Sequence, residues 1–81
     1  MKIYIIKPRT KEIDKNIMQN FLMFNPADEF TDNINEADKC ILQKGWTASK
    51  YAMDEYIYAH KHNIPCIEGY IYTDLFHVHL N

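Results

Sequence analysis

The chain has 81 residues, a length that suits one small domain and excludes a second domain or a large barrel. Its residues are 47% hydrophobic and 25% charged, with only two glycines, which excludes a disordered or low-complexity segment. Nine Lys and Arg residues against eleven Asp and Glu give a net charge of −2. This charge argues against a nucleic-acid polymer as partner, an argument that does not extend to a single nucleoside or nucleotide.

No apolar run approaches the ~20 residues of a membrane span, and residues 1–8 are too short and too soon interrupted for a signal peptide. We therefore expect no membrane association and a cytoplasmic location, in the host cytoplasm if the protein is viral. Cys40 and Cys66 lie in apolar runs, so we expect reduced, buried thiols. A disulfide is the alternative if two adjacent strands place them side by side.

The first half of the chain predicts a strand, a helix and a second strand. Residues 2–7 are an Ile-rich run ended by Pro8, as in a buried parallel strand. Helical spacing of apolar residues predicts a short helix over 11–19, with Thr10 as its cap. Residues 21–24 predict the second strand, and the turn-rich stretch 27–36 predicts a loop with a short helical turn.

The second half repeats this pattern. Residues 39–43 predict a third strand, and residues 50–63 predict the strongest helix, capped by Thr47 or Ser49. Residues 64–68 predict a fourth strand, and the tail 70–80 reads as a fifth strand or an irregular edge. Together these elements predict one domain over residues 1–81, a small, open, mainly parallel Rossmann-like α/β sheet of four or five strands flanked by helices.

In such sheets ligands bind outside the carboxyl ends of the strands. Glu55 shares the face of the long helix with Ala52 and Ala59, which is the core-facing stripe. Either Glu55 points into a crevice, where burial makes it a candidate acid or nucleophile, or it lies at the edge of the stripe and pairs on the surface. Asp38 precedes the third strand and reads either as a turn residue or as a ligand-binding residue.

Four histidines form two His-x-His pairs, His60 with His62 and His77 with His79. Only the second pair, on a predicted strand, would face one side. Two ligands without a third are weak grounds for a metal, so we predict neither a metal site nor a cofactor. Trp46 by itself is typical of a core aromatic residue that closes a turn.

The stretch from Ala37-Asp38 through Gly45-Trp46 and Ser49 to Ala52 and Glu55 resembles the nucleoside 2-deoxyribosyltransferase-like superfamily, in particular a branch of small, often phage or bacterial domains. Their pattern is an Ala-Asp pair that opens a strand, then Gly-Trp, a Ser, an Ala and a Glu within the next helix. The opening strand with Tyr4 and Pro8, and the segments 25–26 and 63–67, resemble the corresponding parts of the same superfamily.

The resemblance implies that Glu55 is a nucleophile that attacks the anomeric carbon of a nucleoside sugar. It implies that Asp38, Ser49 and the surroundings of Tyr4 line the pocket, and it adds Pro8, Gly45 and Trp46 as ligand-binding positions. Two residues depart from the family, Lys7 and Tyr51, where glycine is common. They fit a pocket that prefers an anionic ligand or one that binds its ligand without turnover.

We therefore expect a domain that binds a nucleoside or nucleotide and cleaves, or transfers at, its N-glycosidic bond through Glu55. The alternative is a non-catalytic protein that sequesters a nucleotide-derived signalling molecule, with Lys7 offsetting phosphate charge. Members of the resembling family commonly associate, and so small a core gains from self-association. We therefore expect a homo-oligomer with contacts in the aromatic tail, at residues 70–72 and 75–76.

Overall fold

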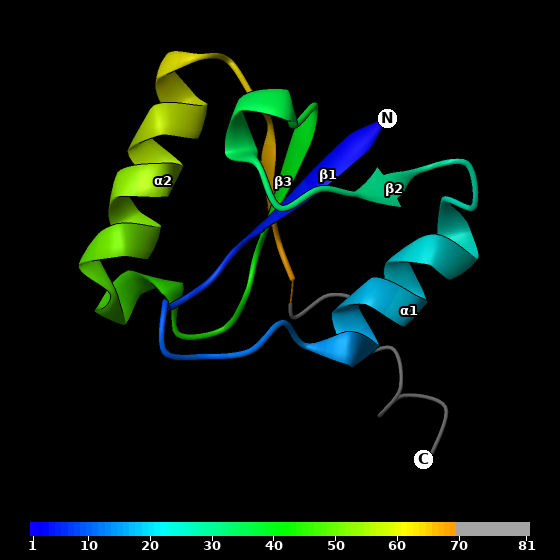
Figure 1. The fold of residues 1–81 in the computed structure, drawn as a ribbon, viewed down its shortest axis with the longest axis horizontal. Helices are drawn as coiled ribbons and strands as arrows, with labels where there is room; N and C mark the ends of the chain where they lie inside the picture. The colour runs from blue at the N-terminus through cyan, green and yellow to red at the C-terminus, as the bar shows by residue number, and fades with distance from the viewer. Residues whose placement is uncertain (70–81) are drawn as a thin grey trace.

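The computed structural model describes residues 1–69, which form an open α/β fold (Figure 1). Its strands are β1 (Lys2–Ile6), β2 (Glu29–Phe30), β3 (Lys39–Leu42) and β4 (Cys66–Glu68), and its helices are α1 (Lys15–Phe24) and α2 (Lys50–Lys61). Two 3-10 helices, η1 (Ile34–Glu36) and η2 (Trp46–Ala48), lie in the connections. The four strands are all parallel in the order β2-β1-β3-β4, which confirms the predicted fold class. The expected fifth strand and oligomer contacts lie outside the described residues.

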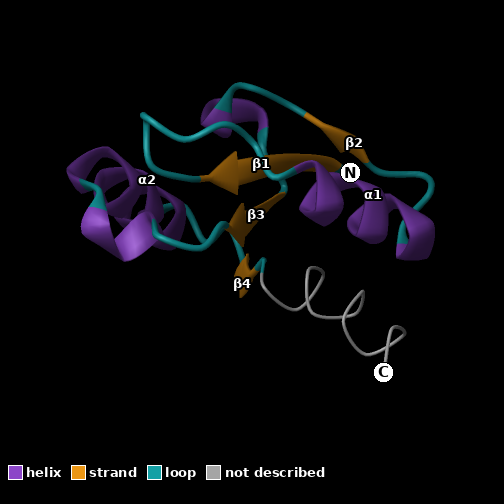
Figure 2. Ribbon diagram, turned by 90° about the horizontal axis from the view of Figure 1, so that it is seen from below, coloured by secondary structure: helices purple, strands orange, loops and turns teal. Residues whose placement is uncertain are grey.

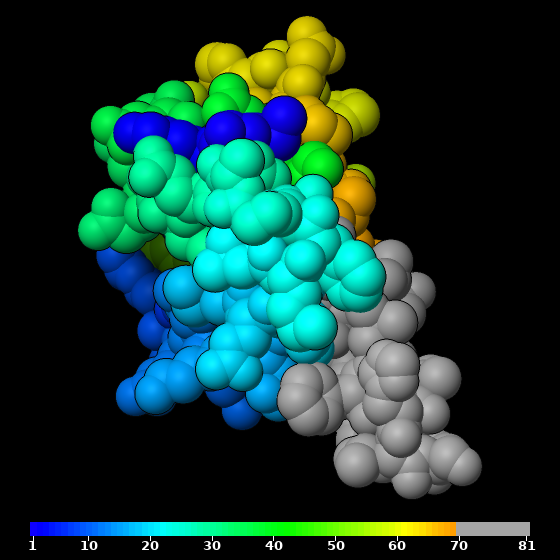
Figure 3. All heavy atoms as spheres, turned by 90° about the vertical axis from the view of Figure 1, so that its right-hand side faces the viewer, coloured from blue at the N-terminus to red at the C-terminus, as the bar shows by residue number. Residues whose placement is uncertain are grey.

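The two helices cover opposite faces of the sheet, as Figures 1 and 2 show from two directions. Successive residues of a strand point to opposite faces, and β1 therefore serves both. Ile3 and Ile5 pack with Ile17 and Phe21 of α1, whereas Ile6 packs in a second cluster under α2. In the space-filling view from the α1 side, α1 (cyan) lies at the centre of the surface (Figure 3).

The prediction of a helix over 11–19 followed by a strand over 21–24 is wrong. One helix, α1, begins only at Lys15 and runs through Phe24. Its cap is Asp14, not Thr10, since the Asp14 side chain accepts a hydrogen bond from the Asn16 amide at 2.9 Å. The apolar run 21–24 completes the helix because Ile17 and Phe21 share one buried face at helical spacing.

The second strand of the sheet is instead β2, at Glu29–Phe30, within the stretch that the sequence predicts to be a loop. Asn25 ends α1, because its backbone N–H and its side-chain amide both donate to the Phe21 carbonyl at 3.0 Å. The short helical turn predicted between 27 and 36 is present as η1.

Helix α2 follows its prediction closely. Ser49 caps it, with its Oγ accepting from the Ala52 amide at 3.3 Å. Asn63 adopts a left-handed conformation (φ 57°) just beyond the last turn, as its residue type favours. Ala52 and Ala59 are fully buried against the sheet. None of the described helices is long and apolar enough to cross a membrane.

Cys40 and Cys66 are register partners on β3 and β4, and both are free thiols. They lie side by side, as the disulfide alternative requires; Cys40 is buried, as predicted, whereas Cys66 is only partly buried. Burial, with the neighbouring Cys66 thiol, raises the pKa of Cys40 from its ordinary 9.0 to about 12. Burial also raises the pKa of Cys66. Both thiols therefore stay protonated at neutral pH.

Candidate functional site

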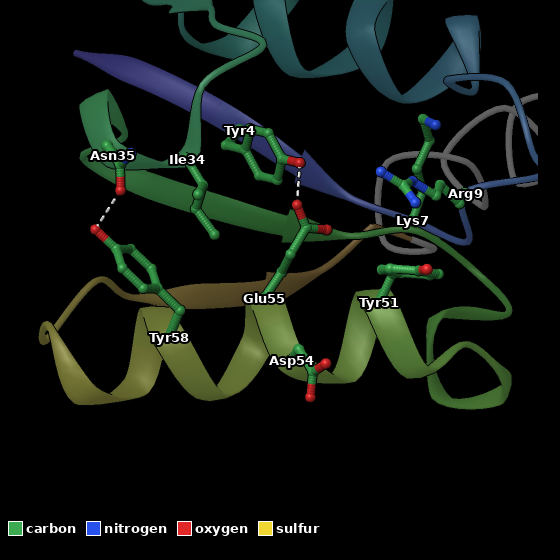
Figure 4. A pocket seen from close by; sticks show the side chains of 9 residues that line it. All are labelled: Tyr4, Lys7, Arg9, Ile34, Asn35, Tyr51, Asp54, Glu55 and Tyr58. Atoms are coloured by element: carbon green, nitrogen blue, oxygen red, sulfur yellow. Dashed lines mark hydrogen bonds between the residues drawn. The ribbon is translucent and has the colours of Figure 1, made fainter.

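A hollow of about 470 Å³ lies between α2, η1 and the carboxyl end of β1 (Figure 4). We call it the first hollow. Three segments line it. Residues from β1 and the loop that follows it are Tyr4, Lys7 and Arg9; those from η1 are Ile34 and Asn35; those from α2 are Tyr51, Asp54, Glu55 and Tyr58. Its size falls within the range of roughly 300–1,000 Å³ that is usual for small-molecule sites.

Glu55 directs its carboxylate into this hollow from the second turn of α2 (Figure 4). It lies next to the core-facing stripe of Ala52 and Ala59, which brings it above the sheet, and it is half-buried. Of the two interpretations open from the sequence, the crevice position is the observed one. No ion pair joins Glu55 to a described residue.

Tyr4 meets Glu55 from the sheet. Its hydroxyl donates a hydrogen bond to Glu55 Oε2. Burial, followed by the hydrogen bond and the negative charge of Glu55, raises the pKa of Tyr4 well above its ordinary range. The phenol therefore keeps its proton, and the hydrogen bond holds one carboxylate oxygen in place while Oε1 remains available to a ligand.

Two tyrosines flank the carboxylate along α2. Tyr51 lies four residues before Glu55 and Tyr58 three residues after it, so all three side chains share one face of the helix. The Tyr58 hydroxyl donates to Asn35 Oδ1 of η1 at 2.5 Å, which closes one end of the hollow. The Tyr58 ring also packs on His62, with the ring centres 4.1 Å apart.

The other end of the hollow is positively charged. Lys7 directs its side chain beside Arg9 (Figure 4), and the Arg9 guanidinium stacks 4.2 Å from the centre of the Tyr51 ring. Such a stack orients a guanidinium while leaving its N–H groups free. Tyr51 is thus a platform for Arg9, a contact that a glycine at this position could not make.

A second hollow of about 500 Å³ adjoins the first and shares Arg9 and Tyr51 with it. It lies between the loops that follow β1 and β3, lined by residues 8–11 on one side and by Gly45, Ala48 and Ser49 on the other. Because β2 and β4 lie on opposite sides of the central pair, the carboxyl ends of β1 and β3 form the switch point of the sheet. Ligands of open α/β sheets bind in this place.

The structure thus brings most predicted site residues to the two hollows. Tyr4, Lys7, Tyr51 and Glu55 line the first, and Pro8, Gly45 and Ser49 line the second. Gly45 has a φ of 92°, a conformation that residues with a side chain rarely adopt, and it lets the loop after β3 turn beside Pro8.

Asp38 and Trp46 are the exceptions, and their assignment as pocket residues needs correction. Asp38 lies at the amino edge of the sheet, just before β3, where its carboxylate accepts from the Lys2 amide at 2.8 Å. Trp46 packs on Tyr56, with ring centres 4.8 Å apart, and on the core under α2. Trp46 therefore has the core role that its local pattern favours, whereas Asp38 bonds the Lys2 amide and not the backbone of its own turn.

Arg9, Asn35 and Tyr58 line the first hollow although the sequence did not single them out. The signal for Arg9 was available, because Lys7, Arg9 and Lys11 alternate directly after a strand end. Within residues 1–69, no group of three or more potential metal-ligating side chains comes together, and His77 and His79 lie outside this range.

Comparison with known proteins adds no assignment. No family model matches the chain, and no curated protein or solved structure is significantly similar to it.

Proposed function

We propose that the first hollow binds the sugar of a nucleoside or nucleotide and that Glu55 cleaves the N-glycosidic bond. The observation that carries this proposal is the half-buried carboxylate of Glu55, which faces a ligand-sized hollow and is held by the Tyr4 hydroxyl. A carboxylate fixed in this way at an open hollow is suited to attack a sugar carbon that develops positive charge.

In this reaction Glu55 Oε1 forms a bond to C1′ of the sugar while the bond from C1′ to the base nitrogen breaks. The bonding pair leaves with the base, which takes up a proton from water. Water then attacks C1′ of the glycosyl ester, which frees the sugar, and its proton passes to solvent as the carboxylate is restored. Tyr4 keeps its proton throughout and serves as the positioning donor.

The aromatic residues of the hollow support a nucleoside-type ligand. Tyr51 and Tyr58 stand on either side of Glu55 (Figure 4). Tyrosine rings present flat faces on which a base can stack, with little loss of side-chain entropy. A base that packs beside either ring would leave its sugar near the carboxylate, which lies between them.

The second candidate function is binding without turnover, which one observation favours. Asp54 also borders the hollow, but its side chain points away from Glu55 (Figure 4). Among the described residues, no other carboxylate is directed into the hollow to protonate a departing base. The raised pKa of Tyr4 makes its hydroxyl a weak acid for this purpose. A protein of this kind would sequester a nucleotide-derived signalling molecule unchanged.

Incubation of the protein with nucleosides and nucleotides, followed by chromatography of released base, tests the two candidates. For catalysis, Glu55→Gln should lower base release by roughly 10³-fold or more while the protein remains folded. Glu29→Gln, a similar change at an exposed carboxylate on β2, is the matched control and should leave release unchanged.

Undiminished release by Glu55→Gln would remove Glu55 from the mechanism. Ligand that binds tightly and is recovered intact from the denatured protein would establish sequestration in its place. Neither binding nor release across the panel would reject both candidates.

A further inference from the structure

The loop after β1 carries three cations at alternate positions, Lys7, Arg9 and Lys11. Lys7 and Arg9 border the first hollow, and Arg9 and Lys11 border the second. Among residues 1–69, none of the three has a carboxylate within ion-pair distance. Their charge is therefore not neutralised within the described residues, and the residues that line the two hollows include these three cations and two carboxylates, those of Asp54 and Glu55.

This loop is held in place by hydrogen bonds of its own and by the side chain of Gln43. The Lys11 amide donates to the Pro8 carbonyl at 3.0 Å, and Lys7 Nζ donates to the Lys11 carbonyl at 2.7 Å. Buried Gln43, directly after β3, holds the far end of the loop. Its Nε2 donates to the Glu12 carbonyl, and its Oε1 accepts from the Asp14 amide, both at 2.9 Å. The cations are therefore presented by a backbone that is already ordered, which lowers the entropic cost of binding.

Arg9 and Tyr51 form the wall between the two hollows, since both residues line each of them. The hollows have similar volumes, about 470 and 500 Å³, and each falls within the range of a small-ligand site. A ligand with two similar halves and a negatively charged centre would match this arrangement.

Building on the proposed function, we propose that the ligand is a dinucleotide linked by a pyrophosphate, with one nucleoside in each hollow and its phosphates at Lys7 and Arg9. A guanidinium contacts two phosphate oxygens at once, and Lys7 adds a point charge. A mononucleotide would use the first hollow and the cations alone, so it shares the phosphate contacts but lacks those of the second hollow.

Binding to Glu55→Gln, which separates affinity from turnover, tests this inference. The probes are adenosine, adenosine 5′-monophosphate and diadenosine diphosphate, together with the corresponding uracil series, measured by calorimetry. Within one series, we expect the monophosphate to bind roughly tenfold tighter than the nucleoside, because it adds charged hydrogen bonds. We expect the dinucleotide to bind roughly tenfold tighter again, because it adds the second nucleoside. In that background, Arg9→Gln should weaken both phosphate-containing probes by about tenfold or more, a larger loss than for the nucleoside, which lacks the phosphate contacts.

A second variant pair addresses the second hollow alone. Ala48 lines it and is exposed, whereas the neighbouring exposed Thr47 lines neither hollow. Ala48→Tyr should fill the second hollow, which removes the extra affinity of the dinucleotide but preserves that of the monophosphate. Thr47→Tyr, of the same size on the same short turn, should preserve both.

The outcomes separate the inference from the proposed function. Equal affinities for monophosphate and dinucleotide, or no effect of Ala48→Tyr on the dinucleotide, would overturn the inference and leave cleavage by Glu55 standing. The expected affinity series, without any release of base by the unsubstituted protein, would uphold the inference and reject cleavage. No binding by any probe would overturn both.

Discussion

Replacement of Gln43 by methionine gives the sharpest test of how the sheet holds the loop at the candidate site. Gln43 is 8% exposed, and its amide makes two 2.9 Å hydrogen bonds, one to the Glu12 carbonyl and one to the Asp14 amide. Methionine has a similar length and volume, so Gln43→Met removes both bonds without opening a large cavity. The perturbation therefore acts on polar partners that lie 31 and 29 residues away in the chain.

The magnitude follows from those two bonds. A typical hydrogen bond contributes about 0.5–1.5 kcal/mol net, and a buried group left without a partner costs about 1–3 kcal/mol. Both bonds are only partly buried, so water can satisfy some of what is lost. We expect Gln43→Met to lower the free energy of unfolding by roughly 2–4 kcal/mol.

Urea unfolding at neutral pH measures this change, with Gln19→Met as control. Gln19 is exposed on α1, and glutamine and methionine have similar helix propensities, so the control should stay within about 0.5 kcal/mol of the parent. Hydrogen exchange adds a local measurement, because the Asp14 amide should lose protection in Gln43→Met. A Gln43→Met protein as stable as the control, with the Asp14 amide still protected, would refute the reasoning that Gln43 anchors the loop.

Three further predictions concern stability, each measured by urea unfolding. Gly69→Ala should cost about 1–3 kcal/mol, because an added Cβ would lie 2.8 Å from the Leu42 carbonyl oxygen; an unchanged stability would show that the turn after β4 relaxes freely. Asp14→Ala should cost about 1 kcal/mol through loss of the α1 cap, and Asp14→Asn, which can still accept the hydrogen bond, should recover most of it. Because the pKa of Cys40 rises from its ordinary 9.0 to about 12, the folded state keeps a proton that the unfolded chain loses. This contribution to stability is full below about pH 9 and falls by up to ~1.4 kcal/mol per pH unit towards pH 12. Cys40→Ala should make this alkaline decline shallower, and an equally steep decline would contradict the assignment.

The local sequence pattern predicts those elements whose conformation is determined by interactions between neighbouring residues. The Ile-rich run of β1 and the alanine stripe of α2 have one preferred periodicity each, and their bounds agree with prediction to within two residues. The run 21–24 is too short for periodicity to distinguish strand from helix. Its helical state depends on the Asp14 cap and on Gln43, which bonds across the fold. A contact between residues so far apart in the chain cannot be recognised from the neighbouring sequence.

In the candidate site, too, some residues could be predicted from the local sequence and others could not. Glu55 could be placed because its position on a helix face follows from spacing alone, and Lys7 because it ends a predicted strand. The alternating cations after β1 indicate Arg9, but its contact with the ring of Tyr51 depends on the turn from Pro8 to Lys11 and forms only in the folded chain. Asp38 was assigned to the pocket from the resemblance, yet strand direction places it at the opposite edge of the sheet.

Tyr4 connects the core to the candidate site. It is the register partner of Cys40, which in turn pairs with Cys66, so these three residues form a row across the face of the sheet under α2. The ring of Tyr4 packs in this apolar cluster while its hydroxyl reaches the hollow and holds Glu55. Packing along the row thereby fixes where the hydroxyl stands, and α2 fixes where the carboxylate stands. The position of the Glu55 carboxylate is therefore set by β1 and α2, two regular elements of the fold, whereas Lys7 and Arg9 at the other end of the hollow are placed by the loop after β1.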